Sequence, residues 1–192
     1  MAESPAEHGP VLPVTLFALP RRRPRVVVQA DLLPALSVLS IVGLLGIPLG
    51  WLWSRLAPPQ RVLVRDGNQF IPLQLESWHR FDDLAISGLL GLAAGVCVGV
   101  AVWLLRERRG PVIMIGAVLG GLLGAWLATR VGVAFANSHY AISGAPRVNS
   151  VIEQAPVIES IWVIFTQPLA TALVYGLLAG WNSRDDLGRR LG

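Results

Sequence analysis

The sequence predicts an all-α membrane protein: a bundle of four transmembrane helices with a small β-containing cap, built from two loops on the extracytoplasmic side. Composition supports the prediction, because 53% of the 192 residues are hydrophobic and only 15% are charged, against about 25% in a typical soluble domain. Four apolar runs each hold about 20 residues or more, which is enough to cross a hydrocarbon core of about 30 Å.

The membrane domain is expected to occupy residues 31–182, between two cytoplasmic tails. Residues 1–30 are rich in Pro and Arg and are predicted to be flexible, because Pro disfavours a long helix. Residues 183–192 form the second, shorter tail. The four transmembrane helices are expected at about 32–56, 83–105, 111–134 and 158–181.

Two prolines and one amide interrupt the apolar cores. Pro48 and Pro168 are each expected to bend their helix, because Pro removes a backbone donor. Gln167 is expected to donate a hydrogen bond across helices, or to satisfy a carbonyl group freed by Pro168, in preference to contacting a substrate. The turn between the second and third helices is very short, so these two helices are expected to form a tight hairpin.

The distribution of Arg predicts the orientation in the plasma (inner) membrane. All 16 basic residues are Arg; ten flank the membrane in the two tails and the short turn, and four lie in the two long loops. The positive-inside rule therefore places both termini and the short turn in the cytoplasm. The residues predicted to set orientation or to contact lipid headgroups are Arg21, Arg22, Arg23, Arg25, Arg106, Arg108, Arg109 and Arg130.

The two outward loops, residues 58–82 and 135–157, are expected to form the cap. In the first loop, β-prone residues flank Asp66-Gly67-Asn68, which is a turn signal for a hairpin. Isolated hairpins are marginally stable, so the second loop is expected to pack against the first.

Small residues recur at a spacing of four in every helix, which places them on one helical face. Such faces allow close backbone approach in lipid, so they are predicted to pack the bundle, with contact to a partner subunit or a lipid tail as the alternative. The glycines of this pattern are Gly46, Gly50, Gly91, Gly95, Gly99, Gly116, Gly120, Gly124, Gly176 and Gly180.

The sequence carries no pattern typical of an enzyme, a cofactor site or nucleic-acid binding. It has neither a nucleophile motif of the Gly-x-Ser-x-Gly type nor a Gly-rich phosphate loop. His79 and His139 share no ligand spacing, so no metal site is predicted. Ionisable residues, including Asp82 and Asp83, are expected only at helix ends, which argues against proton or ion transport.

The chain resembles a family of actinobacterial four-helix membrane proteins of unknown function. The segments that carry the resemblance cover most of residues 32–182 and read WLWSRLAPPQRVLVRDG, SWHRFDDLAISGLLGLAAGV, RERRGPVIMIGAVLGGLLGAWLATRVG and FTQPLATALVYGLLAGW. One mycobacterial protein of this appearance is an accessory subunit of the mammalian-cell-entry (MCE) lipid transporter. The resemblance therefore implies contacts with permease, ATPase or MCE-domain subunits and with phospholipid.

The leading functional hypothesis is a non-enzymatic accessory subunit of a bacterial cell-envelope complex, of which an MCE-type lipid importer is the favoured example. Such a subunit would stabilise or regulate the complex through helix packing. The alternatives are an accessory subunit of a respiratory supercomplex, a small independent transporter, and an enzyme acting on lipid headgroups.

Overall fold

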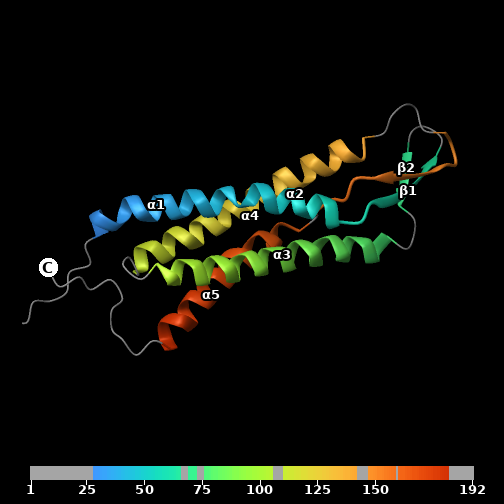
Figure 1. Ribbon diagram of the computed structural model, residues 1–192. Coiled ribbons are helices and arrows are strands. Elements are labelled where there is room, and N and C mark those ends of the chain that lie inside the picture. Colours follow the sequence, from blue (N-terminus) through green and yellow to red (C-terminus); the bar gives the residue numbers. More distant parts are fainter. Residues whose placement is uncertain are drawn as a thin grey trace, which may run out of the picture.

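The computed structural model describes residues 28–65, 69–72, 76–105, 110–141, 147–158 and 160–181. These residues form an elongated helical bundle with a small sheet at one end (Figure 1). The four predicted apolar helices are confirmed as long and apolar enough to cross a membrane, over Asp31–Leu56, Phe81–Leu104, Pro111–His139 and Ile161–Trp181. Residues 1–27, 106–109 and 182–192, which hold the predicted cytoplasmic Arg clusters, lie outside the described ranges.

The first span consists of two helices, α1 (Val28–Leu44) and α2 (Gly46–Leu56). The interruption falls at Leu45, one turn before Pro48 rather than at the proline itself. Pro48 has no N–H to donate to the carbonyl group of Leu44, four residues earlier, so the ladder of helical hydrogen bonds fails there. The first span is thus interrupted at Leu45, on the N-terminal side of Pro48, where the sequence predicted a bend.

At the sheet end, two helices extend beyond their expected bounds. Helix α3 spans Glu76–Leu104 rather than beginning near 83, and α4 spans Pro111–His139 rather than ending near 134. Hydropathy locates the part of a helix that suits the bilayer, whereas a helix can continue through polar residues into the aqueous side. The loops are therefore shorter than the sequence indicated.

The fourth span begins as a 3-10 helix, η2 (Ile161–Phe165), and continues as α5 (Thr166–Trp181). Pro168 lies in the first turn of α5, where a missing N–H costs little. The expected kink within one continuous helix is therefore replaced by a change of helix type just before the proline.

The sheet contains three antiparallel strands in the order β2-β1-β3. Strand β1 (Gln60–Arg65) pairs with β2 (Gln69–Pro72) and with β3 (Val151–Gln154). The first loop supplies β1 and β2 and the second supplies β3, which confirms the predicted β-structure built from two loops. Val62 and Val64 of the central strand are buried, so the sheet covers apolar side chains.

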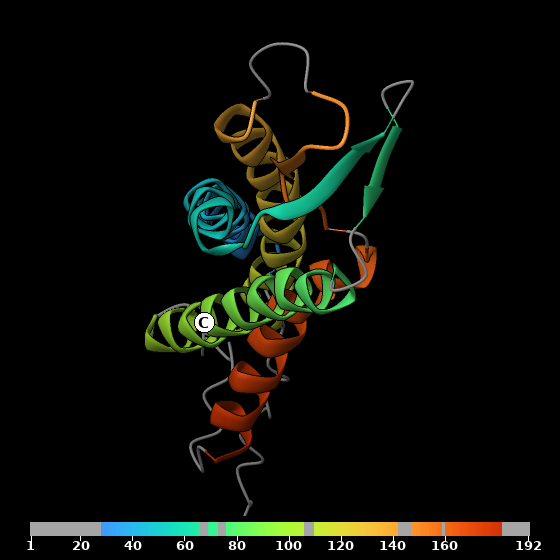
Figure 2. The same cartoon turned by 90° about the vertical axis from the view of Figure 1, so that its right-hand side faces the viewer.

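The helices pair differently from the predicted hairpin of the second and third spans. The most extensive contacts join α4 to α1 and α2, and α3 to α5, whereas α3 and α4 make few. Figure 2, which looks along the bundle from the sheet end, shows α1 and α2 beside α4, and α3 crossing α5. The short turn between α3 and α4 brings these helices together only at one end. Which helices pack along their length depends on the size of the side chains on their faces.

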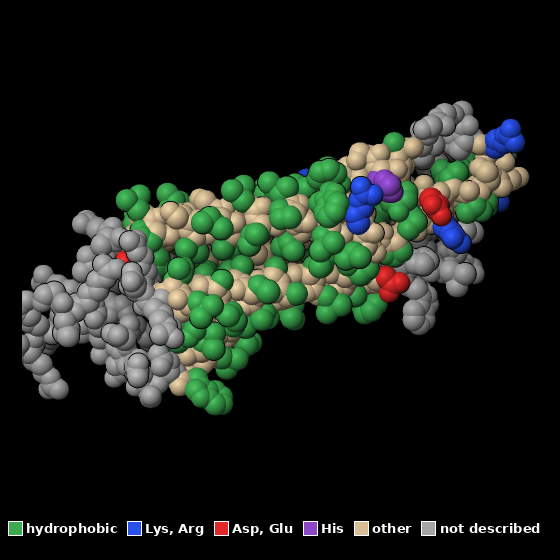
Figure 3. Space-filling view, viewed as in Figure 1, with side chains coloured by type: hydrophobic (Ala, Val, Ile, Leu, Met, Phe, Trp, Pro, Cys, Tyr) green, Lys and Arg blue, Asp and Glu red, His purple; other side chains and the backbone are tan. Residues whose placement is uncertain are grey.

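Two clusters of buried side chains fill the bundle. The first consists of Ala35, Val42, Val98, Val102, Ile113, Ala117 and Tyr175. The second, nearer the sheet, consists of Trp53, Ala57, Ala136 and Ala155. Large apolar side chains also cover the outer surface of the helices. Among the described residues, the charged side chains on the face shown in Figure 3 lie mostly at the sheet end. An apolar outer surface of this kind suits a lipid environment.

The difference between inward and outward apolar residues can be tested on α4. Ile113 is 1% exposed, whereas Ile115 is 56% exposed. Truncation of the buried side chain leaves a cavity, so Ile113→Ala should destabilise the bundle by about 2 kcal/mol or more. Ile115→Ala is the matched control and should have a much smaller effect. Unfolding of the purified proteins in detergent measures both, and equal losses would contradict the described packing.

Candidate functional site

The face of α4 that lacks side chains lies against the backbone of α1 and α2. A Cβ atom added at three of its glycines would stand 2.7–2.8 Å from carbonyl oxygens of α1: Gly116 faces Ala35, Gly120 faces Leu39, and Gly124 faces Val42. Real Cβ atoms do not approach a backbone oxygen so closely. These positions therefore require glycine for steric reasons.

The glycines of α2 complete the same contact from the other side. A Cβ atom at Gly50 would stand 2.5 Å from the carbonyl oxygen of Ala128, and one at Gly46 would overlap the carbonyl oxygen of Gly124. The residue numbers of the facing positions increase together along the two spans, so the first and third spans run parallel. Their backbones touch over most of their length, which is the arrangement that small-residue faces permit in lipid.

A second parallel pair is formed by α3 and α5. Added Cβ atoms at Gly91 and Gly95 would overlap atoms of Thr166 and Gln167, and one at Gly99 would stand 2.9 Å from Cβ of Val174. Eight of the ten glycines predicted for helix packing or partner contact therefore face a neighbour within the chain.

The remaining two, Gly176 and Gly180, have no atom of the described structure within 4 Å of an added Cβ. They lie on an outward face of α5 with Ala172, Leu173, Leu177 and Trp181, which together line a shallow groove. Trp181 is 92% exposed at the rim of this groove. The Ala172/Gly176/Gly180 face repeats the spacing used inside the bundle but has no partner in the described part of the chain.

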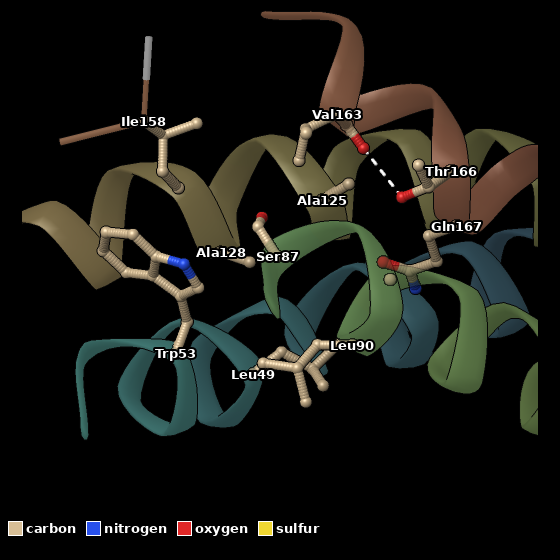
Figure 4. Close-up of a pocket in the computed structure, with 11 residues that line it drawn as sticks. Leu49, Trp53, Ser87, Leu90, Ala125, Ala128, Ile158, Val163, Thr166 and Gln167 are labelled. Atoms are coloured by element: carbon tan, nitrogen blue, oxygen red, sulfur yellow. Dashed lines mark hydrogen bonds between the residues drawn. The ribbon is translucent and has the colours of Figure 1, made fainter. Parts of the chain in front are cut away.

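Gln167 points into a small central cavity between the helices (Figure 4). The cavity has a volume of about 30 Å³, and its lining includes Trp53, Ser87 and Thr166. The Nε2 atom of Gln167 has no hydrogen-bond partner among the described residues. A buried amide without a partner is costly, and a cavity of this size can hold a water molecule that satisfies it.

The hydrogen bond across helices that was expected of Gln167 comes instead from Thr171. The Thr171 hydroxyl lies 3.2 Å from the carbonyl oxygen of Gly95 on α3 and 3.0 Å from that of Gln167 on its own helix. The sequence reasoning passed over Thr171, because a Thr in an apolar helix commonly bonds only to its own backbone. Thr171 follows Gln167 by one helical turn, so the spacing alone places both side chains on the same face of the helix.

Asp83 was expected at a helix end but is buried in the bundle. Helix α3 begins at Glu76, so Asp83 lies two turns inside it, and its side chain is fully buried. Both carboxylate oxygens lack hydrogen-bond partners within the described structure. The indole N–H of Trp53 donates to the Asp83 backbone carbonyl oxygen at 3.1 Å, which ties the first span to the second.

Two Trp–Arg pairs mark the end of the bundle that carries the sheet. The Arg55 guanidinium carbon lies 5.7 Å from the Trp51 ring centroid, and that of Arg130 lies 5.6 Å from Trp126. Both pairs use residues four apart on one helix, and both distances suit a cation–π contact. Of the Arg residues predicted to contact headgroups, only Arg130 belongs to the described part of the chain.

No group of three His, Cys, Asp or Glu side chains in the described residues is arranged to hold a metal ion. His139 is exposed at the end of α4, where its ring packs edge-on against Tyr140 at 5.0 Å. The side chain of His79 is not among those described. The structure therefore does not bring the two histidines into a described site.

Comparison with known proteins finds a family and several relatives. Residues 42–189 match the family described as "Protein of unknown function (DUF2567)". An uncharacterized protein of Mycobacterium leprae is 32% identical over 80% of this chain and 86% of its own length. Uncharacterized proteins of Mycobacterium tuberculosis and Mycobacterium bovis are each 31% identical over 74% of this chain and 84% of their own. No solved structure matches the chain.

The steric requirement for glycine predicts a contrast between two positions. Gly46→Ala should destabilise the protein by about 1–3 kcal/mol or more, because the new methyl group overlaps the backbone of Gly124. Gly176→Ala makes the same chemical change where nothing lies within 4 Å, and it should be neutral or slightly stabilising. Thermal unfolding in detergent compares them, and equal stability of the two variants would refute the assigned contact.

The buried carboxylate predicts an unusual response to charge removal. Asp83→Asn should leave stability unchanged or raise it, because an ionised carboxylate without a partner is costly to bury. Asp82→Asn removes the same charge at an exposed neighbour and serves as the control. Denaturation in detergent at neutral pH is the measurement. A loss of about 2 kcal/mol in Asp83→Asn alone would show that the carboxylate has a required partner.

Proposed function

The chain belongs to the DUF2567 family of proteins of unknown function, and from this premise we propose that it is a non-enzymatic accessory subunit of a bacterial cell-envelope membrane complex. The observation that carries the proposal is the open Ala172/Gly176/Gly180 face of α5. Inside the bundle, faces of this kind are all covered by a neighbouring helix. A partner's transmembrane helix would cover the open face in the same way.

The chemistry of the open face favours a helix as its ligand. Gly176 and Gly180 remove the side chains that would hold a partner backbone away, while Leu173 and Leu177 flank the groove with apolar contacts. In lipid, helices associate through such close van der Waals packing rather than through burial from water. Trp181 at the rim adds a large rigid contact surface of the type common at protein interfaces.

The interior suits a structural role better than transport or catalysis. The central cavity, at about 30 Å³, is large enough for a water molecule but too small for a lipid, a sugar or a typical enzyme substrate. Passage of a solute would require the glycine-mediated contacts to separate. Packing onto a partner requires no such change.

An MCE-type lipid importer is the complex that we favour, with permease, ATPase or MCE-domain subunits as partners. Support for this choice comes from the resemblance of the loop and helix segments to a family of actinobacterial four-helix membrane proteins, because one mycobacterial protein of this appearance is an accessory subunit of that transporter. Localisation in the plasma membrane with both termini in the cytoplasm is part of the proposal, and it rests on the excess of Arg in the tails and the short turn.

The experiment compares glycine variants in a tagged full-length chain, purified gently from its own membranes. Substitution of both open glycines, Gly176→Leu and Gly180→Leu, should reduce the recovery of partner subunits about tenfold or more, because two large side chains would occupy the groove. Gly88→Leu is the matched control, since Gly88 also has nothing within 4 Å but lies on α3 away from this face.

The identity of the recovered proteins decides between the alternatives. Permease, ATPase and MCE-domain subunits support the proposed complex, and haem proteins would replace it with a respiratory supercomplex. Reproducible recovery of the chain alone would overturn the accessory role. Solute flux through the purified chain in liposomes would favour an independent transporter.

A further inference from the structure

A second groove lies at the opposite end of the bundle, between α4 and the segment that leads into the fourth span. It has a volume of about 530 Å³, within the range of about 300–1,000 Å³ that ligand sites occupy. Residues from both sides line it, and most are apolar: Trp126, Val133 and Ala134 from α4, with Val157, Ile158, Ile161 and Ile164 opposite. Polar groups are few and come from Thr129, Arg130, Asn137 and Ser160.

Arg130 places the polar part of this groove at the membrane surface. It follows Pro111, the first residue of α4, by a helical length of about 29 Å at about 1.5 Å per residue. This length equals the thickness of a typical hydrocarbon core, so a span that enters the core at Pro111 brings the guanidinium group to headgroup level on the other side. Exposed aromatic side chains gather nearby, including Trp126 and Phe135 on α4 and Trp162 and Phe165 on η2, as is typical of the membrane interface.

The charge of Arg130 is not neutralised within the described structure. Its side chain is exposed, contacts the Trp126 ring, and makes no ion pair or hydrogen bond with any described residue. The hydroxyl of Ser160, on the opposite wall, makes no capping hydrogen bond to η2. A cation and a hydroxyl donor therefore border an apolar groove, and neither uses its full hydrogen-bonding capacity among the described residues.

We propose that this groove binds an anionic glycerophospholipid. The phosphate accepts charge-assisted hydrogen bonds from Arg130, with Ser160 as a second donor. One acyl chain runs from there towards the Pro111 end of α4, against Trp126 and Ile164. A soluble anion would satisfy the guanidinium but would leave the apolar wall uncovered. An acidic protein segment fits less well than a lipid, because Arg130 lies at headgroup level and exposed aromatic residues typical of the membrane interface surround it. The site is independent of the accessory role, because it lies far from the open face of α5.

The test uses the full chain in an uncharged detergent, with native mass spectrometry to count bound lipid. Phosphatidylglycerol should bind at one equivalent, more tightly than phosphatidylcholine of the same chains, and inorganic phosphate in excess should not displace it. Arg130→Gln should weaken phosphatidylglycerol binding about tenfold or more, the effect of losing one charge-assisted hydrogen bond.

Two further variants separate charge from shape. Arg55→Gln removes an equivalent exposed Arg in the Trp51–Arg55 pair, which lies outside the groove, and should bind lipid as the parent chain does. Ala134→Phe keeps the charge but fills the groove, and it should also lose bound lipid. The proposal would be overturned if Arg130→Gln and Arg55→Gln weakened lipid binding equally, or if Arg130→Gln or Ala134→Phe left it unchanged. It would also be overturned if the chain bound phosphatidylglycerol no more tightly than phosphatidylcholine, or if phosphate displaced the bound lipid.

Discussion

The contact between α4 and the backbone of α1 and α2 is the constraint on which the rest of the structure depends. Apolar side chains gain little by leaving lipid for a protein interior, so helices in a membrane must gain stability from close packing. Glycines at a spacing of four remove the side chains that would prevent it, and here they bring carbonyl oxygens against facing glycines along the first and third spans. Because α4 also packs against α5, it occupies the centre of the bundle, and the α3–α5 pair is positioned through it.

The polar interior follows from the same packing. Close helices leave little space, and few polar side chains of the described residues are buried between them, among them Asp83, Gln167 and Thr171. Thr171 reaches across to the backbone of Gly95 because that glycine has no side chain in the way. The central cavity beside Gln167 is correspondingly small. Close packing thus accounts both for the cross-helix hydrogen bond and for the limited room for a solute.

The two proposed binding surfaces lie at opposite ends of the molecule and differ in chemistry. The open face of α5 lies away from the sheet and offers small residues to another helix. The groove at Arg130 lies towards the sheet and offers a cation beside apolar walls. Because the two proposed surfaces are separate, a partner helix and an interfacial lipid can bind to them at the same time.

The sequence by itself determined the four apolar helices, the two strand-forming loops and the glycine faces, because hydropathy, turn residues and helical spacing are local properties. It also indicated Arg130 as a headgroup contact. Only the tertiary structure decided that the first span pairs with the third, that eight glycines are covered while Gly176 and Gly180 are not, and that Asp83 is buried. A glycine-rich face indicates that a neighbouring backbone can approach closely. Which helix does so depends on the relative rotation of helices far apart in the chain, and no local pattern encodes that rotation.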